Sequence, residues 1–470
     1  MSLGCSGYMR DWEGDSMLLI LDIGTSSMRG MLMDCRGQII KKRQSKYRPE
    51  HMPDGGVLME TGQLNKALET CLEEIGSYCT AEGIYLDGIS VTAQRSSVIP
   101  MGKDGHALCP ALMWQDKRCV GLIEDLTDRT KAIYEICGMR LSPVFSAPKM
   151  RYVKTHMPEI YEQSVKLIGF QEYVLHYLTG EYVTDTSIAS RTCLYDLRMN
   201  KWSEDLLALF EVDKEKLCPI APVGSVVGST RSRIGELLKT DRSIPVVSAG
   251  GDQQCAALGM QDQKEDSLIC NMGTGAYVIA QTDRPVLDPN MRVNCNVGGR
   301  PGTWILEGMI PGAGTTLDWL CNIFYSHLEK EEALKILLKE AEKAPAGARG
   351  MCFVNALAGT GTPEWNLLQN GSFTNLLLRH TREDFARAGL EGIVRDVAGC
   401  VKSVETMLPE KGGPVRVSGG LSRAGFLMEL LEDTLGRSVC RADESEATAL
   451  GAFKSGMQAL NMHGGYYEQS

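Results

Sequence analysis

The stretch Leu18-Leu19-Ile20-Leu21-Asp22-Ile23-Gly24-Thr25-Ser26-Ser27 joins an apolar run to a short glycine-threonine turn, and the chain then continues through Met28 to Met33. A second stretch of the same build, Leu268-Ile269-Cys270-Asn271-Met272-Gly273-Thr274-Gly275, leads into Ala276 to Ala280. A strand, a tight turn and a second strand expose backbone N–H groups and hydroxyls at one point, which suits a phosphate oxygen. Two such turns, one in each half, predict a duplicated fold that closes on a nucleotide.

An acidic turn, Ser248-Ala249-Gly250-Gly251-Asp252-Gln253-Gln254, lies between these two stretches. A carboxylate at this place would face the terminal phosphate of the nucleotide. Each motif alone has a simpler interpretation: either glycine-threonine turn fits an ordinary hairpin, and Asp252 fits the N-cap of a helix over 253–260. The commoner phosphate loops, Gly-x-x-x-x-Gly-Lys-[Ser/Thr] and Gly-x-Gly-x-x-Gly opening a helix, are absent from the sequence. The nucleotide hypothesis therefore depends on the paired hairpins.

The composition is that of a soluble globular enzyme. The 470 residues suffice for two large domains, and the net charge of −10 without a Lys/Arg block argues against a nucleic-acid partner. No apolar stretch approaches membrane-spanning length, so we expect no membrane partner. The sixteen cysteines are scattered singly, which favours reduced cysteines, a cytoplasmic location and no structural zinc. Met17, directly before the first apolar run, looks like a natural start.

Apolar periodicity predicts a mixture of strands and helices in both halves. We expect strands over 18–22, 31–34, 38–41, 86–91, 244–248, 415–417 and 438–440, and helices over 63–79, 390–408, 422–435 and 444–455. We place the domain boundary before the strand that begins at Ile244, which gives domains 17–243 and 244–470. The turn Ser418-Gly419-Gly420 between a strand and a helix is a third loop rich in backbone N–H groups, or else a close strand–helix packing turn.

These motifs together resemble the FGGY carbohydrate kinases, the family of glycerol kinase and xylulose kinase, within the actin-like ATPase superfamily. The resemblance runs from about Leu18 to Gly456. Its motifs are Asp22-Ile23-Gly24-Thr25-Ser26-Ser27-Met28-Arg29, Trp114-Gln115-Asp116-Lys117-Arg118, Ser146-Ala147-Pro148-Lys149-Met150-Arg151-Tyr152, Gly251-Asp252-Gln253, Gly273-Thr274-Gly275, Glu307-Gly308, Gly371-Ser372-Phe373 through Asp384-Phe385, Gly419-Gly420-Leu421-Ser422 and Glu446-Ala447-Thr448-Ala449-Leu450-Gly451. Two positions depart from the family's signatures, because Tyr152 stands where Trp is usual and Asn375 where Gly is usual.

The resemblance implies an α/β fold of two actin-like (ribonuclease H-like) domains, with nucleotide and sugar in the cleft between them. It implies ATP-dependent phosphorylation of a sugar or polyol hydroxyl, with Asp252 as the base and Asp22 orienting Mg²⁺ through water. Contacts to the nucleotide are expected from Thr25, Ser26, Ser27, Arg29, Gly273, Thr274, Gly275, Gly314, Gly419 and Gly420. Contacts to the sugar are expected from Gln94, Arg95, Ser96, Trp114, Asp116, Asp252 and Gln253.

Two of the sugar positions differ from glycerol kinases. Those enzymes carry Glu and Tyr where this chain has Ser96 and Val144, so the pocket should accept a substrate larger than glycerol. Xylulose kinases place Met-His where this chain has Arg95-Ser96, so that match fails as well. Simpler interpretations stay open here, since Arg95 could be solvated or salt-bridged at a strand end and Asp116 could pair with Arg118 or cap a turn.

We therefore predict a kinase for a ketose or polyol of four to six carbons, phosphorylated at a primary hydroxyl. Glycerol kinase is the nearest alternative. Two others are a non-catalytic actin-like or chaperone-like ATP-binding protein and a degenerate kinase that senses sugar. The intact Asp22, Asp252 and glycine-threonine loops favour chemistry. The expected partner is a small molecule, and a homodimer is allowed for.

Overall fold

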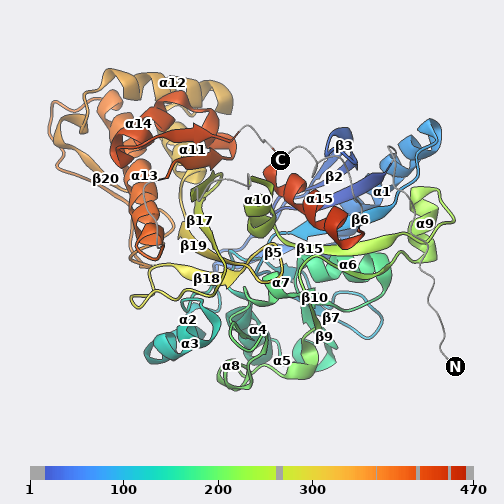
Figure 1. Cartoon of the computed structure of the whole chain (residues 1–470). Coiled ribbons are helices and arrows are strands. Elements are labelled where there is room, and N and C mark those ends of the chain that lie inside the picture. Colours follow the sequence, from blue (N-terminus) through green and yellow to red (C-terminus); the bar gives the residue numbers. More distant parts are fainter. Residues whose placement is uncertain (1–15, 261–267, 367, 409–412, 443–445, 462–470) are drawn as a thin grey trace, which may run out of the picture.

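Two six-stranded sheets organise the chain, in a computed structural model that describes residues 16–260, 268–366, 368–408, 413–442 and 446–461 (Figure 1). The first sheet has the strand order β14-β15-β6-β1-β2-β3 and the second the order β18-β19-β17-β16-β22-β23. In the first sheet β1, β2 and β3 are antiparallel, and β6 and β15 continue from β1 in parallel. In the second sheet β16, β17 and β19 are antiparallel, and β22 and β23 continue from β16 in parallel. The predicted duplication is therefore present in the strand order itself.

The first sheet is built from strands that lie far apart in the sequence. Its members are β1 (Met17–Ile23), β2 (Ser27–Asp34), β3 (Ile39–Lys46), β6 (Gly88–Ala93), β14 (Ser225–Ser229) and β15 (Pro245–Gly251). β1, β6 and β15 are buried on nearly every residue, as parallel strands covered on both faces are. The helices α1 (Thr61–Glu82), α6 (Phe170–Thr179) and α9 (Ser232–Leu238) belong to this half (Figure 1).

The position of β15 differs from the boundary that the sequence suggested. β15 pairs in parallel with β6, with Val246 beside Ile89 and Gly251 beside Ala93, so it completes the first sheet. A boundary between residues 243 and 244 would separate two paired strands of one sheet. The apolar run of Ile244 to Val247 correctly predicted a buried strand, but the partner that it pairs with cannot be read from local sequence.

The second sheet is made of β16 (Leu268–Met272), β17 (Ala276–Thr282), β18 (Asn294–Val297), β19 (Trp304–Ile310), β22 (Val415–Ser418) and β23 (Val439–Arg441). Helices α11 (Gly314–Phe324), α12 (Lys330–Lys343), α13 (Arg382–Glu405) and α14 (Gly425–Leu435) accompany it. α13 begins eight residues before the predicted start at 390, because the Thr381 N–H donates to the Asp384 carboxylate in a capping box. The small strands β20 (Cys352–Val354) and β21 (Ser372–Thr374) form a separate ribbon.

Two helices connect the halves at their junction. α10 (Asp252–Met260) leaves β15 of the first sheet, and α15 (Ala447–Ala459) follows the second sheet but packs on β1, β6 and β15 of the first. They lie side by side near the centre of the molecule (Figure 1). A Cβ added at Gly259 would lie 1.9 Å from the Ala447 carbonyl oxygen, and one added at Gly451 would lie 1.8 Å from the Cys255 oxygen. Only glycine therefore allows this approach.

The remaining elements are β4 (Glu50–His51), β5 (Val57–Met59), β7 (Ile99–Met101), β8 (Ala111–Leu112), α2 (Val120–Glu124), α3 (Thr130–Cys137), α4 (Ser146–His156), α5 (Pro158–Gln163), β9 (Lys166–Ile168), β10 (Thr184–Asp185), α7 (Thr186–Ala189), β11 (Tyr195–Asp196), β12 (Lys201–Trp202), α8 (Glu204–Phe210) and β13 (Ile220–Ala221). Several of them lie at the bottom of Figure 1, with α4, α5 and α8 near the centre and α2 and α3 below β18. Short 3₁₀ turns span Thr127–Arg129, Lys214–Lys216, Ala348–Gly350 and Gly420–Arg423.

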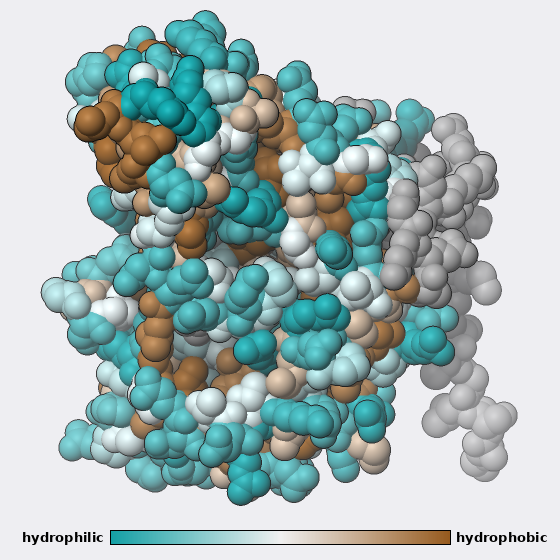
Figure 2. Space-filling model, turned by 90° about the vertical axis from the view of Figure 1, so that its left-hand side faces the viewer, coloured by the Kyte–Doolittle hydropathy of each residue, from teal (hydrophilic) through white to brown (hydrophobic). Residues whose placement is uncertain are grey.

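The face of the molecule in Figure 2 is mostly hydrophilic, but hydrophobic side chains, coloured brown, gather near its top. This face is the left-hand side of Figure 1, where β20 lies. The chain after β21 exposes three consecutive leucines, Leu376, Leu377 and Leu378. None of the helices in the described ranges combines the length and the apolarity that crossing a bilayer would require. Asn375 keeps a φ of 59°, so it holds the left-handed turn where the family usually has glycine.

Candidate active site

The first glycine-threonine turn closes the β1–β2 hairpin. The Gly24 N–H donates to the Ser27 oxygen at 2.9 Å, and the Tyr47 hydroxyl donates to the Gly24 oxygen at 2.6 Å. Ser26 at the tip is exposed, whereas Asp22 before the turn is buried. Gln44 donates from its amide nitrogen to the Ser27 hydroxyl at 3.0 Å. Hydrogen bonds therefore hold the backbone of the turn in place while its tip stays exposed, as a phosphate-binding loop requires.

The second turn lies against two further glycine segments of the same half. The Gly314 N–H donates to the Gly273 oxygen at 2.9 Å, and Thr315 donates to Thr274. A Cβ at Gly419 would lie 2.5 Å from the Met272 oxygen, so the third loop touches the second. Thr274, Gly419 and Gly420 are exposed. The structure therefore gathers all the glycines of the second half that we expected at the nucleotide: Gly273, Gly275, Gly314, Gly419 and Gly420.

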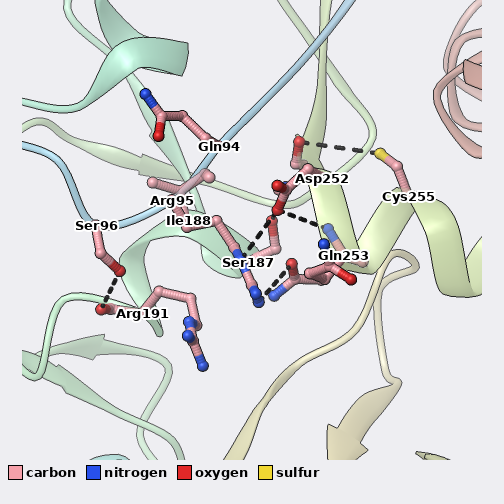
Figure 3. A network of polar contacts seen from close by, with 12 residues as sticks. Gln94, Arg95, Ser96, Ser187, Ile188, Arg191, Asp252, Gln253 and Cys255 are labelled. Atoms are coloured by element: carbon pink, nitrogen blue, oxygen red, sulfur yellow. Dashed lines mark hydrogen bonds and ion pairs between the residues drawn. The ribbon is translucent and has the colours of Figure 1, made fainter. Parts of the chain in front are cut away.

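Asp252 opens α10 directly after β15 (Figure 3). Its Oδ1 accepts from the Gln253 N–H at 2.8 Å and lies 3.2 Å from the Arg95 Nε. Burial raises the pKa of Asp252, and the negative charge of Asp22 adds to this while Arg95 opposes it. A raised pKa favours proton acceptance by the carboxylate, as a general base needs. The helix-start interpretation also holds, because α10 begins at Asp252.

Asp22 and Arg29 form an ion pair across the β1–β2 hairpin, and Arg29 also pairs with Glu446. Lys42 pairs with Glu446 too. Arg29 is thus engaged by two carboxylates rather than pointing freely toward a phosphate, which differs from the expected role. Burial raises the pKa of Asp22, with Arg29 opposing the shift. This network joins the first loop to the segment before α15, a link that local sequence did not reveal.

The expected sugar residues divide into two groups. Gln94, Thr25 and Trp114 are connected, since the Thr25 hydroxyl donates to the Gln94 Oε1 at 3.3 Å and accepts from the Trp114 Nε1 at 3.1 Å. The Gln94 Nε2 is buried without a partner in the described residues, so a donor is available there. The Gln253 Oε1 accepts from Asn271 at 3.2 Å and so reaches the second half.

Asp116 lies outside this group and takes the simpler role that we left open. Arg118 donates to both of its oxygens at 2.7–3.1 Å, and the Val57 N–H donates to its Oδ2 at 3.1 Å. Asp116 is 1% exposed. A carboxylate so fully engaged orders the chain before α2 and leaves little capacity for a sugar hydroxyl.

Arg95 is salt-bridged, but in the interior rather than in solvent. Its NH1 lies 2.8 Å from the Glu307 Oε2, and Arg191 holds the other Glu307 oxygen at 2.7 Å. In the sequence Glu307 stands out only as part of a motif, and no motif includes Arg191. The usable signal was a carboxylate inside the apolar strand Trp304–Ile310, because a buried acid requires a buried cation.

The position of Ser96 connects the two departures from glycerol kinases. The Ser96 hydroxyl donates to the Arg191 carbonyl oxygen at 3.4 Å (Figure 3), and the Arg191 guanidinium lies 4.9 Å from the centre of the Phe145 ring, next to Val144. Ser96 has a φ of 74°, a strained conformation for a residue other than glycine. A small enclosed cavity lies beside it, lined by Gln94, Ser96, Ser146, Glu172 and Thr184 among others.

Within the described ranges, His, Cys, Asp and Glu side chains form no group of three that could hold a metal ion. A divalent cation held through water and by nucleotide phosphates does not need such a group. Asp22 is buried and Asp252 is partly exposed; the two carboxylates lie within electrostatic range of one another, and each has a raised pKa. A cation beside them would offset this repulsion, so the residues fit the hypothesis.

Comparison with known proteins adds an independent line of argument. Residues 17–259 match the model of the N-terminal domain of the FGGY family of carbohydrate kinases, and residues 268–460 match that of its C-terminal domain. The first model ends in the last turn of α10 and the second begins with β16, so both limits lie beyond the boundary that the sequence suggested.

Curated relatives cover almost the whole chain. The glycerol kinase of Thermococcus kodakarensis is 30% identical over 448 residues, which are 93% of this chain and 87% of that protein. The xylulose kinase of Lactococcus lactis subsp. lactis is 26% identical over 436 residues, 93% of this chain and 86% of that one.

Solved structures share the fold. A ligand-bound xylulose kinase from Lactobacillus acidophilus superposes with a TM-score of 0.87 at 24% identity, covering 96% of this chain and 91% of that chain. Glycerol kinase from Plasmodium falciparum with ADP gives 0.83 at 23% identity, covering 96% and 91%. The predicted fold of two α/β domains is confirmed. Because both family models match in order, the chain belongs to the FGGY family of carbohydrate kinases and is a phosphotransferase, and membership of this family implies ATP as the phosphoryl donor.

Proposed function

We propose that this kinase phosphorylates a primary hydroxyl of a ketose or polyol of four to six carbons, with Asp252 as the general base. Asp252 would accept the hydroxyl proton while the substrate oxygen bonds to the γ-phosphorus of ATP and the bond to ADP breaks. The carboxylate of Asp252 directly follows β15, is 28% exposed and has a raised pKa, and these features support this role. Arg95 keeps its orientation fixed through the 3.2 Å contact.

For the nucleotide, we propose contacts from Thr25, Ser26 and Ser27 in the first half, and from Gly273, Thr274, Gly275, Gly314, Gly419 and Gly420 in the second. The exposed tips of the loops support this assignment. Mg²⁺ bound to the phosphates would neutralise charge that develops during transfer. Asp22 would orient it through water, and Arg29 would hold Asp22 in place rather than contact phosphate itself.

The substrate size rests on Ser96 and Val144, which stand where glycerol kinases carry Glu and Tyr. The Ser96 hydroxyl contacts the Arg191 backbone, and the Arg191 guanidinium covers Phe145, which follows Val144. The two polar anchors of glycerol kinases are thus missing from one wall. A pocket without them discriminates poorly in favour of a three-carbon polyol and leaves room for further carbons. Gln94, Arg95, Trp114 and Gln253 are the proposed remaining contacts.

Glycerol phosphorylation is the alternative that the 30% identical relatives favour. Side-by-side kcat/KM values for glycerol, erythritol, ribulose, xylulose and a hexulose distinguish the two. We expect a four- to six-carbon compound to exceed glycerol at least tenfold. Glycerol as the best substrate by tenfold or more would overturn the proposal and make the Ser96 and Val144 differences neutral.

We also propose a cytoplasmic location and a homodimer. All fifteen cysteines in the described residues are unbonded, which supports a reducing compartment. Exposed Leu376, Leu377 and Leu378 support self-association. Sedimentation velocity of the wild type and of Leu377→Asp tests the dimer: a monomer in both would contradict it.

A further inference from the structure

Glu307 lies in the middle of β19 and is completely buried, with a fractional exposure of 0%. β19 is hydrogen-bonded on both sides, because Glu307 pairs with Ile279 of β17 and with Asn294 of β18. The backbone that carries this carboxylate is therefore fixed by the second sheet. A buried acid at such a place needs cationic partners, and both of them come from the other half of the chain.

Each oxygen of Glu307 has its own guanidinium. Arg95, which follows β6 of the first sheet, lies 2.8 Å from Oε2, and Arg191, which follows α7, lies 2.7 Å from Oε1. Burial alone would raise the pKa of Glu307, but the two arginines outweigh it and hold the pKa below its usual range. Glu307 is thus an anion that ties two segments of the first half to the second sheet.

Arg95 is in turn shared between two carboxylates. Its NH1 contacts Glu307 and the Gln254 Oε1, while its Nε contacts Asp252. Its guanidinium also lies 5.9 Å from the centre of the Tyr277 ring of β17. The second sheet therefore determines where Arg95 sits, and Arg95 determines how Asp252 is presented at the start of α10 (Figure 3).

We propose that Glu307 is a positioning residue for phosphoryl transfer. Because Arg95 pairs with Glu307 as well as with Asp252, it orients Asp252 without neutralising the Asp252 carboxylate completely. Two buried arginines face two carboxylates here, Glu307 and Asp252. If Glu307 loses its charge, Asp252 becomes the only carboxylate beside Arg95. A base held in such a pair accepts a proton less readily. The inference rests on the proposed role of Asp252.

The test is the variant Glu307→Gln, which keeps the shape of the side chain and removes its charge. We expect kcat to fall at least tenfold, while the KM for ATP stays within about twofold because the glycine loops are untouched. Glu340→Gln is the matched control. Glu340 lies on α12, is also buried, and pairs with Arg382, the first residue of α13. The expected kcat of this control is within twofold of wild type, whatever the substitution does to the melting temperature.

A double-variant cycle separates positioning from general damage. In the background Asp252→Asn, adding Glu307→Gln should lower the residual kcat less than twofold, because the base through which Glu307 acts is gone. The full tenfold loss in both backgrounds, or no loss in the wild-type background, would overturn the inference while leaving the role of Asp252 intact. Near wild-type turnover of Asp252→Asn alone would overturn both. If Glu307→Gln does not fold, Glu307→Asp replaces it. This variant keeps the charge but retracts the carboxylate from Arg95 by one methylene, so we expect a smaller loss of kcat that is again absent in the Asp252→Asn background.

Discussion

Gly273 and Gly420 lie in the two second-half turns proposed to hold the nucleotide, and alanine at either should weaken ATP binding without weakening the fold. No atom lies within 4 Å of the place that a Cβ would take at these glycines. Neither has a positive φ. Alanine therefore adds neither a clash nor strain, and it restricts the unfolded chain, which stabilises a protein by about 0.4–1 kcal/mol. The melting temperature without nucleotide should stay the same or rise slightly.

The loss in ATP affinity follows from the hydrogen bonds at stake. A methyl group at the open side of the turn keeps the phosphate from the backbone N–H groups, and a hydrogen bond to a charged acceptor contributes roughly 1.5–3 kcal/mol. Loss of one such bond raises the Kd for ATP by about 10- to 100-fold. Titration calorimetry measures this Kd directly, and steady-state kinetics should show the sugar KM within about twofold of wild type.

Gly419 supplies the matched contrast. It has a φ of 88°, and a Cβ there would lie 2.5 Å from the Met272 oxygen, so Gly419→Ala should lower the melting temperature by several degrees. The reasoning fails if Gly273→Ala and Gly420→Ala leave the Kd for ATP unchanged. It also fails if they lower the melting temperature as Gly419→Ala does and affect both substrates equally, since that result would favour simple packing turns.

Three further predictions follow from individual side chains. Asp252→Asn should keep the Kd for ATP within about twofold and lower kcat by roughly two to four orders of magnitude; near wild-type turnover would leave Asp252 as a helix cap only. The double variant Ser96→Glu/Val144→Tyr should shift the ratio of kcat/KM for glycerol over a five-carbon ketose at least tenfold toward glycerol, and an unchanged ratio would contradict the pocket assignment. Burial raises the pKa of Glu172 to about 7, so between pH 4.5 and pH 7 the folded chain keeps a proton that the unfolded chain releases. The raised pKa therefore does not destabilise the fold below pH 4.5. Its cost in the free energy of unfolding grows from pH 4.5 to pH 7 and is complete above pH 7. Glu172→Gln should therefore raise the free energy of unfolding by roughly 3 kcal/mol at pH 8 and leave it nearly unchanged at pH 4 in urea titrations; an equal effect at both pH values would refute the assignment.

Local sequence predicted the elements well because their signals are local. The helix expected over 63–79 is α1, Thr61–Glu82, and the strand expected over 415–417 is β22, Val415–Ser418. Hydrophobic periodicity sets both, and neither depends on a distant partner. The helix expected from 422 begins instead at Gly425, because a 3₁₀ turn over Gly420–Arg423 comes first. Such a turn has no pattern that distinguishes it from the first turn of a helix.

Pairings between distant segments were beyond the sequence. The strand that begins at Pro245 reads as the opening of a new unit, yet its hydrogen bonds go back to β6. Arg95 reads as a sugar contact or as a solvated or salt-bridged arginine, but nothing near it in the sequence identifies its buried partner Glu307, more than two hundred residues later. Arg29 reads as a phosphate contact, yet Glu446 reaches it from the segment before α15. A buried charged residue in the sequence predicts that a partner of opposite charge exists, but not where in the sequence that partner lies.

Both halves contribute contacts around Asp252, the proposed base, although Asp252 itself belongs to only one of them. Asp252 lies at the end of the first sheet, but Arg95 is held against it by Glu307 of the second, and Asn271 of β16 reaches Gln253 at 3.2 Å. The helix that Asp252 opens then meets α15 at Gly259, where no side chain fits. Any relative movement of the two sheets must shift these contacts together. It follows that a movement of the proposed nucleotide loops of the second half would be transmitted to Asp252, the proposed base, through Glu307 and Asn271, to which no substrate contact is assigned.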